Sequence, residues 1–312
     1  MINILIKSFR NWIIIINRKE QKVKIINALR NYIILSKPRL VYLLFFTGFT
    51  AMVIAGSLYG YDWLEIIILS LSIILGVMGS NAMTNFIDRK MDGIMGRTKK
   101  RPIPSGKIKP RNALIYAVIM VVIGIIMAGI INIWSGVFIL LGFLDSAIVY
   151  NALTKRKTPF SIILGAPAGG LPVLAGWVGI SGRLELLPLL LFILIMIWTP
   201  IHIWSLAYFY RKDYQKAGVP MLPVILDSKK IYIILTVLNF LMVGFSVYIG
   251  CLYSLSLIYI ISSAIFGLVI ILFSFRLIIK GEEKIAWVLF KLTSPYLAVI
   301  FIILTIEFIL IK

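Results

Sequence analysis

The stretch "NFIDRKMDGIMGRTKKRPIPSG", residues Asn85–Gly106, lies between two segments that are apolar enough to cross a membrane. It places two carboxylates, Asp88 and Asp92, among six basic residues up to Arg101. On a helix these carboxylates share one face a turn apart, where like charges repel unless a cation lies between them. Spacing alone favours a solvated surface pair, and a hard metal ion with oxygen ligands is the alternative. The rest of the chain decides between these interpretations.

The composition is that of a membrane protein. Of the 312 residues 61% are hydrophobic, and the mean hydropathy is +1.01. A soluble domain of this length is far less apolar. A helix needs about 20 apolar residues to cross the hydrocarbon, and nine segments of about this length are present: Val41–Leu58, Leu64–Ile87, Ala113–Ile131, Trp134–Leu153, Phe160–Ile180, Leu186–Phe209, Ile231–Gly250, Leu255–Arg276 and Trp287–Leu310. We therefore expect an all-α, polytopic membrane protein with nine transmembrane helices.

The positive charge is distributed unevenly between the loops. A net charge of +20 would suggest a nucleic-acid partner for a soluble protein. With nine spans, however, 30 of the 32 Lys and Arg residues fall on one side of the membrane, and only Arg183 and Lys312 fall on the other. This asymmetry follows the positive-inside rule, so we expect a cytoplasmic N terminus, an external C terminus and a cytoplasmic catalytic face in the cell membrane. Membrane lipid is then the expected surrounding, and no nucleic acid is expected.

The N-terminal segment differs from the rest of the chain. Residues 1–35 mix basic and apolar residues without a small-residue cleavage site, which favours a helix on the anionic cytoplasmic leaflet over a signal peptide. We therefore divide the chain into this basic amphipathic segment, 1–35, and a membrane domain, 36–312. The single cysteine, Cys251, excludes an intramolecular disulfide and a cysteine-rich metal site.

The loops on the basic side combine acids with bases. The run Arg97–Arg101 follows the two carboxylates, Lys155–Lys157 follows the fourth span, and Arg211, Lys212 and Asp213 follow the sixth. Ordinary loop charge is an equal alternative for each basic residue, but topology gives no reason for acids among them. If the loops converge, carboxylates that hold Mg²⁺ and cations that bind phosphate would form a diphosphate pocket above an apolar bundle. Such a pocket would suit a prenyl diphosphate.

Four motifs resemble a known family. Asp88–Pro102, a D-x-x-x-D followed by "RTKKRP", resembles the first motif of the UbiA superfamily of intramembrane prenyltransferases. Within that superfamily the protohaem IX farnesyltransferases, or haem O synthases, are the most similar branch. Their motifs are matched by Thr154–Trp177, Trp198–Ala207 and Lys212–Val224, and "SKPRLVYLL" (Ser36–Leu44) is also similar. The similarity extends from Ser36 to the last span.

The resemblance implies a fold, a reaction and a set of residues. A UbiA-type bundle would transfer a farnesyl group from farnesyl diphosphate to a vinyl group of haem b, with Mg²⁺ as cofactor. The implied catalytic and metal-binding residues are Asp88, Asp92 and Asp213, and the implied diphosphate contacts are Arg97, Arg101, Lys155, Arg156, Arg211 and Lys212. Thr84 or Asn85 would lie beside the metal or support its ligands. Haem A synthase or an oxidase assembly factor would be a candidate partner.

The sequence allows several interpretations of the acceptor and of the residues that would bind it. The resemblance implies His202, the only histidine, and Trp204 as contacts of haem or another acceptor, whereas a lone histidine in a span can also be a core residue. A related enzyme that prenylates an aromatic or lipid acceptor is the second interpretation, although Ala217 replaces the second acid expected in quinone-type relatives. A transporter ranks third, because few charges, most clearly Asp145 and Glu307, lie within the spans.

Overall fold

The computed structural model describes residue 21 and residues 23–310. Most of the predicted membrane-surface segment, residues 1–20 and 22, lies outside the described residues, as does Lys312. Residues 23–35 are helical. Residues 23–30 of this helix are exposed, whereas Leu35 and the following Ser36 are buried. The division of the chain at residue 35 stays a prediction.

Within the described part, nine helical spans are long and apolar enough to cross a membrane, and no strand occurs, which confirms the predicted fold class. Seven spans are single or continuous helices: α2 (Pro38–Tyr59), α3 (Trp63–Ile94), α4 (Pro110–Ile131), α8 (Leu186–Phe209), α11 (Ser228–Leu252), α12 (Leu257–Lys280) and α13 (Glu283–Leu310). The other two are composite, α5 (Ile133–Leu144) with the π-helix η1 (Asp145–Thr154), and α6 (Ser161–Leu164) with α7 (Pro167–Ser181). Short helices α9 (Arg211–Lys216) and α10 (Leu222–Ile225) follow α8.

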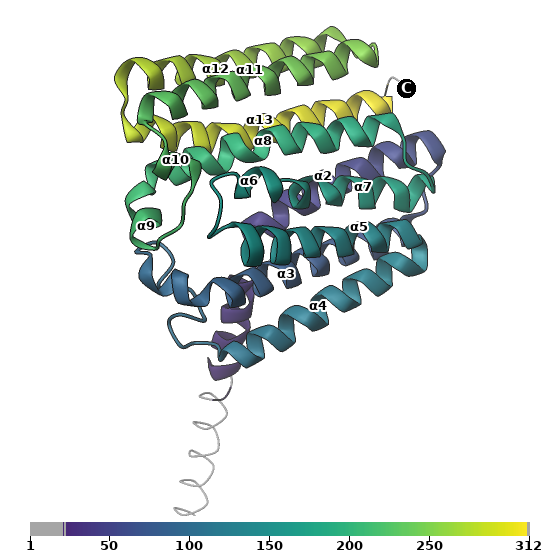
Figure 1. The fold of residues 1–312 in the computed structure, drawn as a ribbon. Coiled ribbons are helices and arrows are strands. Elements are labelled where there is room, and N and C mark those ends of the chain that lie inside the picture. The colour runs from purple at the N-terminus through teal and green to yellow at the C-terminus, as the bar shows by residue number, and fades with distance from the viewer. Residues whose placement is uncertain (1–20, 22, 311–312) are drawn as a thin grey trace, which may run out of the picture.

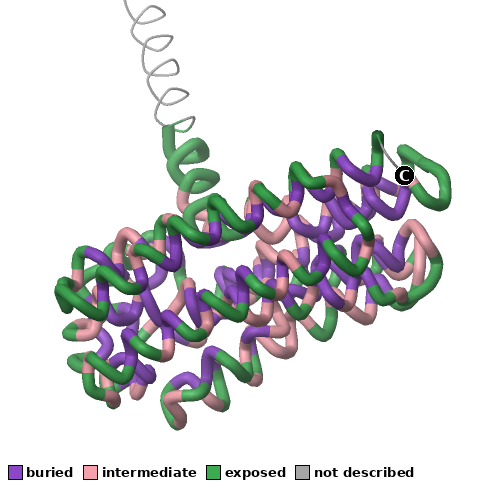
Figure 2. The backbone as a smooth tube through the Cα atoms, turned by 90° about the horizontal axis from the view of Figure 1, so that it is seen from above, coloured by how far each residue is buried: buried purple, intermediate pink, exposed green. Residues whose placement is uncertain are grey.

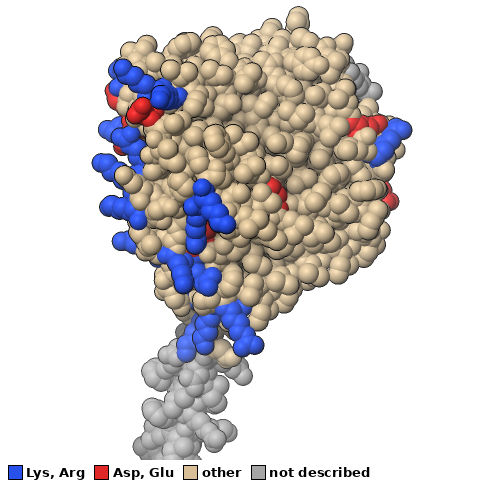
Figure 3. All heavy atoms as spheres, viewed as in Figure 1, with Lys and Arg blue, Asp and Glu red and all other residues tan. Residues whose placement is uncertain are grey.

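The helices lie side by side in a bundle, with α11 and α12 at one edge and α4 at the other (Figure 1). Buried residues follow the sides of the helices that face one another, and exposed residues follow the outside (Figure 2). At the left end of the bundle in Figure 1, the α3–α4 loop lies near α9. Lys and Arg side chains gather at this end (Figure 3), which we call the basic end.

Helix α3 extends further than its apolar run. The predicted span ends at Ile87, but the helix continues to Ile94, so Asp88 and Asp92 both lie on its last turns. Hydropathy marks where a helix leaves the hydrocarbon, whereas backbone hydrogen bonds can continue into the polar region. This extension presents the two carboxylates from a rigid element at the basic end.

The fourth and fifth spans depart from regular α-helix. The fifth is interrupted at Gly165 and Ala166, before Pro167 begins α7. A broken helix within a membrane must find partners for its freed N–H groups. Asp145, at the start of η1, supplies one, because its Oδ2 accepts the Ala168 N–H at 2.9 Å. Asp145, whose role the sequence left open, therefore caps α7.

Small residues allow close helix packing, as they commonly do in membranes. A Cβ atom added to Gly124 of α4 would lie 2.8 Å from the backbone N of Gly76 and 2.8 Å from the carbonyl O of Ser72, both on α3. Gly129, on the same helix, has nothing within 4 Å of the corresponding position. Gly124 therefore allows α3 to approach closely, whereas Gly129 of the same helix has no such contact.

We predict that Gly124→Ala lowers the stability of the protein in detergent by about 1–3 kcal/mol, because a methyl group there forces α3 and α4 apart. The matched control, Gly129→Ala, should leave the thermal unfolding midpoint unchanged or raise it. Thermal unfolding of both variants tests this, and equal midpoints would contradict the assigned close contact.

Candidate active site

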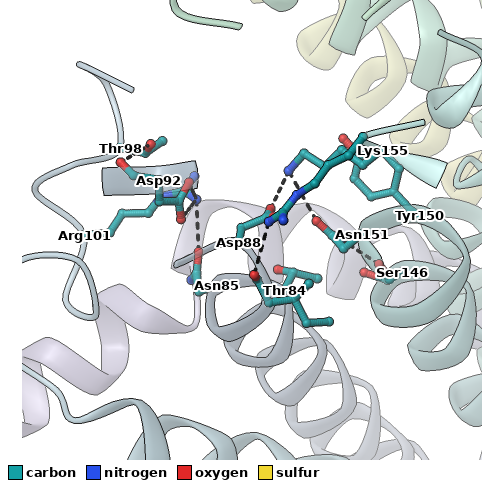
Figure 4. A network of polar contacts seen from close by, with 12 residues as sticks. Thr84, Asn85, Asp88, Asp92, Thr98, Arg101, Ser146, Tyr150, Asn151 and Lys155 are labelled. Carbon is teal, nitrogen blue, oxygen red and sulfur yellow. Dashed lines mark hydrogen bonds and ion pairs between the residues drawn. The ribbon is translucent and has the colours of Figure 1, made fainter. Parts of the chain in front are cut away.

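Asp92 is paired with a cation from its own loop. It is only 1% exposed, and Arg101 Nη1 donates to its Oδ1 at 2.9 Å and to its Oδ2 at 2.7 Å (Figure 4). The same nitrogen lies 3.1 Å from Asn85 Oδ1. Thr98 Oγ1 donates to the Asp92 carbonyl oxygen at 3.0 Å, which folds the loop back onto the helix end. Arg101 is thereby directed into the bundle.

Asp88 is paired with cations from a different segment. Lys155, which follows η1, donates from Nζ to Asp88 Oδ2 and also lies 3.3 Å from Asn151 Oδ1 (Figure 4). Arg156 Nη2 lies 3.8 Å from Asp88 Oδ1. This oxygen is buried and accepts no hydrogen bond. Because buried polar atoms are normally hydrogen-bonded, Asp88 Oδ1 is an acceptor that a ligand can use.

The π-helix sets the position of Lys155. In η1, backbone hydrogen bonds between residues five apart replace the four-apart bonds of an α-helix. In addition, the Asn151 side chain donates from Nδ2 to the Ser146 carbonyl O at 2.7 Å. Such π segments are rare and often mark functional sites. Here the segment ends with Lys155 N bonded to the Tyr150 carbonyl O at 2.8 Å. The wider winding places Lys155 at Asp88 of α3, with Asn151 Oδ1 on the other side of the Lys155 ammonium.

Thr84 and Asn85 connect the carboxylates to the start of the membrane domain. Asn85 Nδ2 donates to the Leu35 carbonyl O at 2.6 Å, and Thr84 Oγ1 accepts from Lys37 Nζ at 3.0 Å. Thr84 therefore positions the Lys37 ammonium near the carboxylates, and Asn85 joins the backbone at Leu35 to the Arg101 guanidinium.

Lys37 is a site residue that sequence reasoning missed. It adopts the left-handed backbone conformation, with φ 54°, at the N-cap of α2. Desolvation by burial lowers the pKa of Lys37 to about 7, with further lowering by the positive charges of Arg101 and Lys155. Its place in "SKPRLVYLL", directly before a proline that begins a span, was the available signal.

The third carboxylate lies in the segment after α8. Asp213 Oδ2 accepts the backbone N–H of Arg97 at 3.3 Å, so α9 contacts the α3–α4 loop. The Arg97 guanidinium lies 5.4 Å from the centre of the Tyr210 ring. Asp213 is therefore at the basic end, beside a cation of the first motif.

Arg211 and Lys212 do not join these groups. Arg211 Nη2 pairs with Glu283 Oε1 at 3.1 Å, and its Nη1 contacts Ser228 Oγ at 3.1 Å. Lys212 is exposed to solvent. The structure thus brings Arg97, Arg101, Lys155 and Arg156 to the three aspartates and directs Arg211 toward α11 and α13.

The three aspartates do not form a ready-made metal site. Among residues 21 and 23–310, no group of three or more His, Cys, Asp or Glu side chains is close enough to hold a metal ion. The three aspartates are therefore not gathered into one cluster. Asp88 and Asp92 nevertheless fit a hard divalent cation in donor chemistry, since both offer carboxylate oxygens and Asp88 Oδ1 has no hydrogen-bond donor.

An apolar cavity extends from this polar network into the bundle. Its volume is about 230 Å³, and its walls come from α2, α3, α5, η1, α6, α7 and α8. Ser80 and Asn81 of α3 line it just before Thr84, and Tyr150 lines it beside Lys155, whose Nζ lies 5.4 Å from the ring centre. The network is thus the polar end of the cavity. A ligand with an anionic head and an apolar tail would match both parts.

His202 lines the same cavity. Its Nδ1 lies 2.9 Å from Thr293 Oγ1, which lies 3.1 Å from the Phe290 carbonyl O. If Thr293 donates to that carbonyl, Nδ1–H donates to Oγ1 and Nε2 carries the lone pair. Trp204 differs: it is 2% exposed, lies in the hydrophobic core and does not line the cavity.

The sequence is similar to those of known membrane prenyltransferases. The model of the UbiA prenyltransferase family matches residues 43–302. Protoheme IX farnesyltransferase 1 of Picrophilus torridus is 38% identical, over 90% of this chain and 95% of its own length. Protoheme IX farnesyltransferase of Thermoplasma acidophilum is 35% identical, over 88% of this chain and 96% of its own length.

Solved structures share the fold. A structure of digeranylgeranylglyceryl phosphate synthase aligns with a TM-score of 0.74 at 20% identity and covers 90% of this chain and 99% of its own. A UbiA homolog from Archaeoglobus fulgidus, bound to GPP and Mg²⁺, aligns with a TM-score of 0.64 at 18% identity and covers 88% of this chain and 99% of its own.

We predict that Arg101→Met lowers the free energy of unfolding by about 3 kcal/mol, because Asp92 would stay buried without its cation. The double variant Asp92→Leu/Arg101→Met should recover most of this loss. Equilibrium unfolding in detergent measures both, with Arg111→Met, at an exposed position, as the control. Equal losses in the single and double variants would show that the unpaired charge is not the cause.

Proposed function

The chain belongs to the UbiA prenyltransferase family, and on that premise we propose that it transfers the farnesyl group of farnesyl diphosphate to a vinyl group of haem b. Prenyl transfer and a multi-pass membrane fold follow from the family itself. The observation that carries the proposal is the buried Asp88, with its free oxygen among cations, at the polar end of an apolar cavity. The names of relatives at 35–38% identity support haem b as the acceptor.

We assign the diphosphate head to the polar end. Asp88 and Asp92 would hold Mg²⁺, which would stabilise the charge that develops on the departing diphosphate. Asp213, which the resemblance also implied as a metal ligand, is not clustered with this pair and would act as a third carboxylate beside Arg97. Lys155 and Arg156 already lie at Asp88, and Arg97 lies beside Asp213. Preorganised cations of this kind stabilise a leaving group without having to reorganise during the reaction.

The apolar cavity is assigned to the farnesyl chain and the reacting carbons. The C1–O bond of the allylic diphosphate breaks, and the electron pair leaves with the diphosphate. The terminal vinyl carbon of haem b then bonds to C1, and the carbon next to the porphyrin ring becomes cationic. Water adds to that carbon and loses a proton, which gives the hydroxyethylfarnesyl side chain. The apolar walls protect the first cation from water, and Tyr150 presents an aromatic ring beside Lys155.

His202 supports haem as the acceptor. The residue lines the cavity, and with Nδ1–H donated to Thr293 its Nε2 would carry a lone pair. Neutral imidazole nitrogen is a good ligand for iron. We therefore assign His202 to the acceptor side of the cavity. The buried Trp204 would act only through packing.

We infer that the basic end of the bundle faces the cytoplasm. The positive-inside rule is the physical basis, and the diphosphate site then lies on the cytoplasmic face. Cys251, near the end of α11, would lie on the external side and is exposed.

For activity, we predict that Asp88→Asn lowers kcat by about 10² or more. The metal ion at the diphosphate would lose a carboxylate ligand, and Lys155 and Arg156 would lose the negative charge that positions them. Purified protein in lipid would receive haem b, farnesyl diphosphate and Mg²⁺, and mass spectrometry would detect a haem heavier by one farnesyl group plus water. Asp227→Asn, a highly exposed position, is the control and should keep wild-type turnover. An unmodified haem with the wild-type protein, together with prenylation of an aromatic or lipid acceptor, would overturn the assignment of haem b.

For topology, we predict that a membrane-impermeant maleimide labels Cys251, the single cysteine of the chain, from outside intact cells. In a Cys251→Ser background, Lys107→Cys in the exposed α3–α4 loop should be labelled only after permeabilisation. The opposite pattern would reverse the orientation.

A further inference from the structure

Five rings from α8 and α13 form a continuous stack, which we call the aromatic column: Phe209, Trp287, Phe290, His202 and Trp198. Phe209 and Trp287 lie 4.9 Å apart between ring centres at 26°, and Trp287 and Phe290 lie 5.0 Å apart at 21°. His202 follows at 4.2 Å and 34°, and Trp198 at 4.5 Å and 20°. Neighbouring rings therefore cover much of one another's faces, and the side of the column presents a row of ring edges.

The column connects the basic end to the cavity. His202 and Trp198, at its inner end, line the cavity wall. At the other end Tyr210 meets Phe209 edge-on at 4.9 Å, and the Arg97 guanidinium lies over the Tyr210 ring. The ends of the column therefore adjoin the two parts of the proposed active site.

A membrane-interface aromatic belt does not explain this arrangement. Belt residues gather at the depth of the lipid headgroups. Trp198 and Phe209 are eleven positions apart on α8, which corresponds to roughly 16 Å along the axis at 1.5 Å per residue. That length is about half of the hydrocarbon thickness. The column therefore follows the depth of the membrane.

The column is accessible and has cations beside it. Phe209, Tyr210, Trp287 and Phe290 are all partly exposed. The exposed Lys291 places Nζ 5.3 Å from the centre of the Trp287 ring, and Arg97 is the second cation. A flat ligand here would meet a row of ring edges along its face and positive charge at its edge.

We propose that the aromatic column is the docking surface along which a planar tetrapyrrole with two carboxylates reaches the cavity. The proposal rests on the proposed function, because haem b is such a molecule. The macrocycle lies across the partly exposed ring edges in edge-to-face contact, and a carboxylate pairs with Lys291 near the membrane surface, while Arg97 stays with the diphosphate. The vinyl-bearing edge then points down the column toward His202 and the cavity.

The test measures the affinity of porphyrins for the full-length protein in lipid nanodiscs, corrected with protein-free nanodiscs. Iron-free protoporphyrin IX and its dimethyl ester are titrated against the wild type, Trp287→Leu and Lys291→Gln. Trp134→Leu, an exposed tryptophan of α5 outside the column, is the matched control. Turnover with haem b gives KM and kcat for the same variants.

Trp287→Leu should weaken binding of both porphyrins by roughly threefold to tenfold, the range expected for a lost edge-to-face aromatic contact. It should raise KM for haem b and leave KM for farnesyl diphosphate unchanged. Lys291→Gln should weaken binding of the dicarboxylate but not of the ester. Unchanged affinities in both variants, or an equal loss in Trp134→Leu, would overturn the docking surface while wild-type turnover of haem b would still support the proposed function. A wild type that neither binds porphyrin nor converts haem b would overturn both.

Discussion

An ionised carboxylate that is removed from water must find a cation, and α3 carries two such groups at its end, Asp88 and Asp92. One is met by Arg101, from the loop that follows α3, and the other by Lys155, which lies 67 positions further along the chain. These pairings determine how the loop folds back and how η1 lies against α3. Removing one partner would leave a charge in a place where burial makes it costly. The charged groups that fix the structure of the polar end of the cavity are therefore the same groups that allow it to bind a ligand.

The cavity and the polar network form one site because α3 belongs to both. Its middle turns, including Ser80 and Asn81, line the apolar space, and its last turns carry the carboxylates. Cations surround the carboxylates but do not satisfy them fully, since Asp88 Oδ1 accepts no hydrogen bond. The site thus keeps both an anionic ligand oxygen and an excess of positive charge. A metal–diphosphate needs this combination, which neither a purely acidic nor a purely basic pocket would provide.

Sequence reasoning predicted the nine spans and the acidic pair, because the thickness of the hydrocarbon sets the length of an apolar run. It could not predict the π-helix of η1, since an extra residue per turn leaves the apolar composition unchanged. The pairing of Lys155 with Asp88 depends on that winding. Likewise, His202 and Trp204 are two positions apart, so on an α-helix they point in nearly opposite directions, and only one can face the cavity. Arg211 and Lys37 depend on loop conformations that no periodic pattern records.

The cap that Asp145 provides for α7 has a consequence for membrane insertion. The fifth span, with its break at Gly165 and Ala166, would enter the bilayer alone with an unpaired N–H group near its middle. The fourth span carries the missing acceptor, and the Asp145 carboxylate is itself costly in lipid without a donor. Each span thus removes a penalty from the other. The two spans are therefore best inserted together, as a helical hairpin whose arms reach the membrane interior as one unit.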